Sequence, residues 1–356
     1  MSIGNPGVGL SLRDAMLNMT RNPTRLWHAS SLVANSNDDD AIATMAGYIK
    51  PTAERAAVYY ATSSVSRDLG AAARALQQEH LVRFYREDFP TPFGLMVFDG
   101  DDYELPSWGT YGKQTLRGIL WAVAADALIL WSIVHDRSDF EEHARIFSFG
   151  GAHFRQMLAA PWGRQMQIVP GPNPQQRAEA EESKGWPGGK GVTLQSDGIV
   201  RIHGGDIATF REETEKKIPG YDAGISVEDE QVQVAYAAAA IFRLVYTWTQ
   251  FVADEIVTVS RAALSRAERR RAEREKTPEP QLNVILLRRV RHERPEGDEI
   301  HDVDWKSRWY VHGHWRNQPY GPRDNPEYRA KFITGYIKGP EGKPLVMKDR
   351  VIVLGR

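Results

Sequence analysis

The residues of this chain with the most evident potential for binding chemistry gather between Trp305 and Arg356. This segment holds eleven Lys and Arg residues against four Asp and Glu residues, a local net charge of +7. Because the whole chain carries −1, the preceding 304 residues carry −8. Such an asymmetry is typical of proteins that bind a polyanion or an acidic protein surface, and it favours binding over catalysis.

Aromatic and hydrogen-bonding side chains alternate where the basic segment begins. Trp309, Val311 and Gly313 occupy every second position, the period-two pattern of a half-buried β-strand. Arg316 could contact phosphates while Trp315 stacks on a base. The sequence equally allows the tryptophans to form a small core, with the cations serving only solubility. The candidate binding residues are Arg308, His312, His314, Trp315, Arg316, Asn317, Gln318, Lys338 and Lys343.

Two histidines in this segment raise the question of a metal site. His312 and His314 are two positions apart, so on a strand both imidazoles lie on one face. A zinc site needs three or four ligands, and the chain has no cysteine to complete one. No spacing typical of a nucleophile elbow or of a paired His–Glu helix occurs elsewhere. We therefore expect no metal and no cofactor. A metal-dependent nuclease or nucleotide-processing enzyme that uses these histidines with a carboxylate is the alternative class.

The composition is that of a folded chain. With 42% hydrophobic and 26% charged residues, a mainly disordered protein is excluded. The absence of cysteine excludes disulfides and fits a reducing compartment. The most apolar window, residues 234–259, is interrupted by Arg243, Asp254 and Glu255, so we expect no membrane-spanning helix. The first residues contain neither a basic leader nor an apolar signal core, and we expect a cytoplasmic protein.

The elements that must position the basic segment follow from hydrophobic periodicity and from the positions of Gly and Pro. Ser66 and Ser226 are the expected N-caps of two helices, and the length of the second helix favours a kink or a break near Thr258. The expected helices are 52–62, 66–86 and 226–278, and the expected strands are 94–98, 116–123, 127–134 and 282–287. Strands 116–123 and 127–134 are expected to form a β-hairpin.

These elements predict an α+β protein with a central antiparallel sheet packed on the long helix. The arginine-rich residues 261–276 allow two interpretations: Arg and Glu at helical spacing solvate a surface helix, or they extend the basic surface of the tail. The expected regions are a helical N-terminal region (1–88), a β-rich central region (89–225) with a Pro/Gly-rich loop at 170–195, the long helix (226–280) and a small basic β-module (281–356).

The run from Trp309 to Gln318, followed by residues 336–345, resembles the C-terminal signature of a large uncharacterised family of proteins from actinobacteria, their phages and their plasmids. More remotely, the Gly-His-x-Arg core at 313–316 is similar to phage and plasmid proteins that include a type V anti-CRISPR inhibitor. That resemblance implies suppression of a CRISPR nuclease through recognition of its nascent chain and loss of its transcript. Trp315 between His and Arg, and the loop 339–344, depart from the anti-CRISPR pattern.

The charge pattern and the resemblance together predict a non-catalytic binding protein of a phage or mobile element, with an implied counter-defence role. Its expected partner is nucleic acid, RNA or DNA, or a host or competitor protein with an acidic surface. If Arg308, Arg316, Lys338 and Lys343 neutralise four phosphates, log affinity falls with log salt at a slope of about −3 to −4. A structural phage component is a third hypothesis, and the sequence leaves the oligomeric state open.

Overall fold

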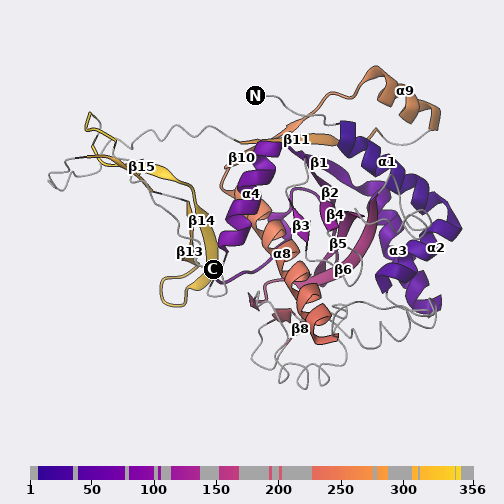
Figure 1. Cartoon of the computed structure of the whole chain (residues 1–356), viewed down its shortest axis with the longest axis horizontal. Helices are drawn as coiled ribbons and strands as arrows, with labels where there is room; N and C mark the ends of the chain where they lie inside the picture. The colour runs from indigo at the N-terminus through magenta and orange to yellow at the C-terminus, as the bar shows by residue number, and fades with distance from the viewer. Residues whose placement is uncertain are drawn as a thin grey trace.

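The fold was analysed in a computed structural model of the whole chain (Figure 1). The structure describes residues 7–34, 39–76, 80–99, 103–105, 114–136, 152–167, 192–194, 200–202, 227–275, 279–287, 307–311, 313–340 and 342–345. The expected cap Ser226, most of the expected loop at 170–195 and the candidate residue His312 lie outside these residues.

A mixed β-sheet forms the centre of the molecule, with the strand order β10–β11–β1–β2–β4–β5–β6 and β3 paired to β4. β1 runs parallel to β2 and to β11, whereas the other pairs of this sheet are antiparallel. The expectation of an antiparallel sheet is therefore wrong around β1. The strands are β1 (Ala57–Ala61), β2 (Phe93–Phe98), β3 (Glu104–Leu105), β4 (Gln114–Val123), β5 (Ala127–Asp136), β6 (Ala152–Pro161), β10 (Val257–Arg261) and β11 (Leu282–Leu287).

Helices cover both faces of this sheet (Figure 1). One apolar cluster joins one face to α1 (Gly7–Arg21), α2 (Pro23–Ala34) and α3 (Asp39–Arg55). A second cluster joins the other face to α4 (Ser63–Ala75) and α8 (Val227–Ala253). Three short strands, β7 (Met166–Gln167), β8 (Val192–Leu194) and β9 (Val200–Ile202), form a separate small sheet. The helices and sheet together establish an α+β arrangement.

The coverage of both faces explains why β1 was expected to be a helix. Tyr59 belongs to the cluster under α4 and α8, whereas Val58 and Tyr60 belong to the cluster under α1 to α3. Every residue of β1 is consequently buried. A strand that is buried on both faces shows a continuous apolar run without polar alternation, and such a run resembles a buried helix.

Helix α4 begins and ends earlier than its sequence pattern predicts. Thr62 occupies the N-cap position, and Ser66, the expected cap, lies inside the helix and donates its hydroxyl proton to the carbonyl of Ala61. The helix ends at Ala75, and Leu76 at the C-cap position has an extended backbone. Phe84 is fully buried against Phe242 and Tyr246 of α8, a contact that an uninterrupted helix to residue 86 would not make.

The arginine-rich segment is separate from the long helix. Helix α8 ends at Ala253, and Glu255 then adopts a positive φ of 52° before the chain enters β10. A second, shorter helix, α9 (Arg266–Glu275), carries most of the arginines. The expected strand 94–98 and the expected hairpin 116–123/127–134 agree with β2, β4 and β5. Within the described residues, no helix is both long and apolar enough to cross a membrane.

A test of the sheet packing uses Gly94, which pairs with Trp121 across β2 and β4. A Cβ atom at Gly94 would lie 2.0 Å from the indole of Trp121, which also donates a hydrogen bond to the carbonyl of Thr91. We expect Gly94→Ala to lower the free energy of unfolding by about 1–3 kcal/mol, because the indole must shift within a packed core. Urea unfolding followed by tryptophan fluorescence measures this.

Gly47 provides the matched control. It lies on the exposed side of α3, and a Cβ there would meet nothing within 4 Å. Gly47→Ala is expected to raise stability by about 0.5–1 kcal/mol, because alanine is the better helix former. Equal effects of the two substitutions would contradict the close approach between Gly94 and Trp121.

Candidate nucleic-acid interface

The C-terminal residues form two antiparallel ribbons of two strands each. β12 (Trp309–Val311) pairs with β15 (Tyr336–Lys338), and β13 (His314–Tyr320) pairs with β14 (Glu327–Ile333). Figure 1 shows β13 and β14 beside α4 and α8, whereas the end that contains β15 extends away from the body. The two ribbons must therefore be considered separately as binding surfaces.

Trp315 attaches the β13–β14 ribbon to the body. Its side chain is 6% exposed and belongs to the cluster that contains α4 and α8. The indole N–H donates to the carbonyl oxygen of Ala72 at 2.8 Å, and the ring packs against Tyr246 and Phe332. The sequence left open whether Trp315 stacks on a ligand or anchors a small core. The structure places it in the core, because a buried indole with a hydrogen-bonded N–H has no face available for a base.

Main-chain hydrogen bonds attach the same ribbon. The Ala330 N–H donates to the carbonyl of Leu81 at 2.8 Å, and the hydroxyl of Tyr246 donates to the carbonyl of Ala330 at 2.6 Å. Asn317, a candidate binding residue, accepts a hydrogen bond from the Leu81 N–H through its side-chain oxygen at 3.0 Å. Burial raises the pKa of the Tyr246 hydroxyl far above its ordinary value, so it remains protonated and continues to donate.

Acidic residues of the body partly neutralise the cations of β14. The ammonium group of Lys331 lies 2.8 Å from a carboxylate oxygen of Asp254, and a guanidinium nitrogen of Arg329 lies 3.7 Å from Asp88. The guanidinium of Arg329 also lies over the ring of Tyr320, at 4.2 Å from its centroid. These partners come from loops and helix ends far away in sequence, which is why the composition of the tail did not identify them.

The same contacts shift two pKa values. Burial raises the pKa of Asp88, although the backbone hydrogen bond from Tyr85 and the charge of Arg329 oppose that rise. Burial disfavours the charge of Arg329, yet its hydrogen bond to Tyr320 and the nearby Asp88 produce a net increase of its pKa. The guanidinium is therefore held as a cation, with its charge directed toward the body.

The remaining candidate residues divide between the two ribbons. His314 and Arg316 are exposed on β13, and Gln318 beside them is half-buried. Lys338 is exposed on β15, and Lys343 is exposed just beyond it. Within the described residues no group of three or more His, Cys, Asp or Glu side chains is placed to hold a metal ion, so the metal-dependent alternative gains no ligand set there.

The part of the chain that extends from the body is the β12–β15 ribbon with its flanking residues, which we call the projecting ribbon and define as residues 307–311 and 336–345. Tyr310 and Ile337 are cross-strand partners, 46% and 52% exposed respectively. With Leu345, which is also exposed, these two residues form apolar surface on the ribbon that the sequence did not single out. The sequence of the projecting ribbon contains Arg308, Lys338 and Lys343 and one carboxylate, Glu341, which gives it a net charge of +2.

Local contacts give the projecting ribbon a defined shape. The Arg308 N–H donates to the carbonyl of Pro344, and its guanidinium Nε donates to the carbonyl of Lys343, both at 2.8 Å. Gly339 has a φ of +117°, and a Cβ there would meet the backbone of Ser307 and Arg308. Because glycine has no Cβ, residue 339 can adopt this φ and lie directly against the backbone of residues 307 and 308.

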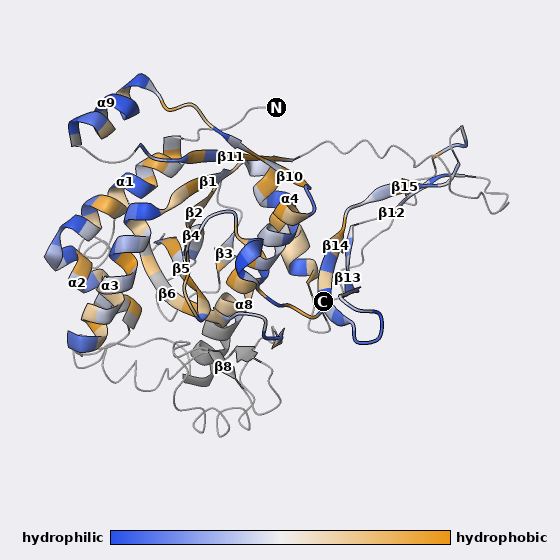
Figure 2. Cartoon of the chain, turned by 180° about the vertical axis from the view of Figure 1, so that it is seen from behind, coloured by the Kyte–Doolittle hydropathy of each residue, from blue (hydrophilic) through white to orange (hydrophobic). Residues whose placement is uncertain are grey.

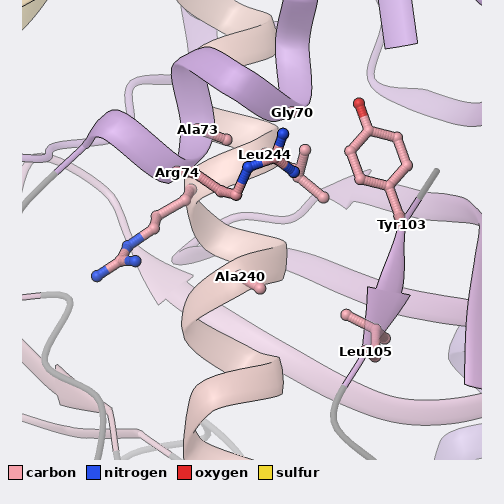
Figure 3. Close-up of a pocket in the computed structure, with 8 residues that line it drawn as sticks. Gly70, Ala73, Arg74, Tyr103, Leu105, Ala240 and Leu244 are labelled. Carbon is pink, nitrogen blue, oxygen red and sulfur yellow. The ribbon is translucent and has the colours of Figure 1, made fainter. Parts of the chain in front are cut away.

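A pocket of about 130 Å³ lies between α4, α8 and β3 (Figure 3). Its wall is mainly apolar, and the guanidinium of Arg74 points away from Tyr103 in Figure 3. The Tyr103 hydroxyl donates a hydrogen bond to the carbonyl of Ser66. Pockets for small molecules usually measure about 300–1,000 Å³. We therefore assign no ligand to this pocket.

Comparisons of the chain with protein-family models and with curated proteins find no match.

The attachment of the β13–β14 ribbon predicts a pH-dependent effect of Arg329→Met. Without the guanidinium, the pKa of Asp88 rises further above its unfolded value. A raised carboxyl pKa favours the fold at low pH, and that contribution is lost as pH rises through the folded pKa. We expect the substitution to cost about 1–2 kcal/mol at pH 7 and clearly less at pH 4.5. Urea midpoints at the two pH values measure it.

Arg323→Met is the control for this experiment, since Arg323 is exposed in the turn between β13 and β14. It should leave the urea midpoint unchanged at both pH values. A destabilisation by Arg329→Met that is the same at pH 4.5 and pH 7 would show that the Asp88 pair does not contribute, and that only the contact with Tyr320 is lost.

Proposed function

We propose that this protein binds double-stranded DNA without catalysing a reaction on it, and that the projecting ribbon makes the contact. The observation that carries the proposal is that this ribbon leaves the body with three cations against one carboxylate, Glu341, in its sequence. Residues 1–304 carry −8 and repel a polyanion. The contact is therefore expected to concentrate where the chain extends away from that charge.

The shape of the projecting ribbon supports duplex DNA as the ligand. The major groove of B-form DNA is about 12 Å wide and admits a two-stranded β-ribbon. The major groove of A-form RNA is too deep and narrow for protein side chains to reach its bases. Helix-in-groove recognition would require an exposed basic helix near this end of the molecule, and the elements described there are strands.

The two faces of the projecting ribbon supply different contacts. Lys338 pairs with Trp309 on one face, and Tyr310 pairs with Ile337 on the other, because side chains alternate along a strand. Lys338, with Lys343 beyond the strand, is suited to phosphates, which fix position without reading sequence. Tyr310 and Ile337 offer apolar surface for the methyl groups of thymine or for base edges. The counter-defence role implied by the family resemblance stays a prediction beyond this contact.

The test is fluorescence anisotropy with a labelled 30-base-pair duplex over a range of salt concentrations. We expect the Lys338→Glu/Lys343→Glu variant to weaken binding at least about tenfold at physiological salt. It should also reduce the slope of log affinity against log salt by about 2, because each phosphate contact contributes about 0.9. Both lysines are exposed, so the variant is expected to remain folded, which its thermal unfolding midpoint checks.

The matched control is Arg25→Glu/Lys50→Glu, which changes the charge equally at two exposed cations of α2 and α3. Its affinity should remain near that of the wild-type protein. Equal loss in both double variants would indicate a nonspecific effect of net charge and contradict the proposal. Equal affinity for duplex RNA would contradict the groove fit, and salt-insensitive capture of an acidic protein with no DNA binding would favour a protein partner.

A further inference from the structure

Helix α9 presents a row of arginines on a defined face. The helix begins with a capping box in which the Glu268 N–H donates to the Ser265 hydroxyl at 3.2 Å and the Ser265 N–H donates to the Glu268 carboxylate at 2.6 Å. Arg266, Arg270 and Arg274 are spaced by four residues, so they lie in one row along the helix. The capping box fixes the residue at which the helix begins, and the helical geometry then fixes the side of the helix on which the row lies.

The row faces away from the buried side of α9. Ala272 is 6% exposed, and it lies two residues, about 200° around the helix, from Arg270 and from Arg274. All three arginines of the row are exposed. The row spans eight residues, or about 12 Å, which is comparable with the rise of three to four base pairs of DNA at about 3.4 Å each.

Helix α9 carries five arginines and three glutamates, so it retains a net charge of +2. Among the side chains that the structure describes, no carboxylate lies within ion-pair distance of Arg266, Arg270 or Arg274. Like charges four residues apart on a helix repel each other and lower its stability. A line of negative charges beside the row would therefore reduce the repulsion between its arginines.

Helix α9 and the projecting ribbon lie on different sides of the body. In Figure 1, α9 follows β10 at one end of the molecule, and β15 extends from the opposite end. Figure 2, the view from behind, shows the same separation and the hydrophilic character of α9. The basic helix therefore does not extend the basic surface of the tail.

We propose that the row Arg266–Arg270–Arg274 is a second DNA-backbone site, so that one chain joins two duplex segments. The inference rests on the proposed DNA binding by the projecting ribbon. The ligand chemistry is a row of phosphodiesters, since guanidinium groups donate paired hydrogen bonds to phosphate oxygens and remain charged at every physiological pH. Contacts to phosphates carry no sequence information directly, so we expect this contact to be independent of DNA sequence.

The experiment measures bridging directly. An unlabelled duplex is fixed to beads, and capture of a second, fluorescent duplex is measured with and without the full-length protein. We expect wild-type protein to capture the second duplex, and Arg266→Gln/Arg270→Gln/Arg274→Gln to reduce capture roughly tenfold. Glutamine is nearly as good a helix former as arginine, so α9 should persist, which circular dichroism checks. Binding of a single duplex in solution should fall much less, because the ribbon remains.

A matched control removes three other exposed arginines, as Arg25→Gln/Arg67→Gln/Arg323→Gln, and should capture the second duplex like the wild-type protein. Capture that survives the α9 substitutions overturns the second site, as it would if two copies joined through their ribbons. In that case the ribbon proposal stands if Lys338→Glu/Lys343→Glu still weakens binding of a single duplex. A ribbon variant that binds a single duplex normally overturns the proposed function instead, and no binding by wild-type protein overturns both.

Discussion

The burial of Trp315 between α4 and α8 is the contact on which the arrangement of the C-terminal residues depends. A series of ring contacts runs from the sheet to this indole, through Phe89, Phe84 and Tyr246. Removing such a buried aromatic side chain typically costs about 3–5 kcal/mol. The hydrogen bond from the indole N–H to the carbonyl oxygen of Ala72 fixes the ring in one orientation against α4. The β13–β14 ribbon is thereby part of the body, and the ribbon beyond it is held at a defined place.

This attachment divides a single stretch of sequence into two roles. Trp309 and Trp315 are six residues apart, yet Trp315 is buried in the body and Trp309 lies half-buried on the ribbon that extends from it. The acidic body supplies Asp88 and Asp254 as partners of Arg329 and Lys331. Part of the positive charge of the tail thus stabilises the fold. We propose that the cations of the projecting ribbon and, separately, the arginines of α9 bind an external polyanion.

The central sheet imposes a second constraint, because its strands come from widely separated parts of the chain. Residues 57–61 pair with residues 282–287 on one side and with residues 93–98 on the other. Segments from three of the four expected regions therefore contribute strands to one sheet. Pairing of segments more than two hundred residues apart requires a large loss of chain entropy before any contact forms, and such topologies fold slowly. The three parallel strands consequently depend on most of the chain being in place.

The sequence by itself determined the elements whose signals are local. The prolines before residue 94, the apolar runs of β4 and β5 and the charge asymmetry of the tail each arise from neighbouring residues, and they predicted β2, the hairpin and a basic C-terminal segment. Only the tertiary structure decided the identity of β1, whose two-sided burial removes the alternation that marks a strand. It also decided which tryptophan is buried, since a period-two pattern distinguishes the faces of a strand but not which face another element covers.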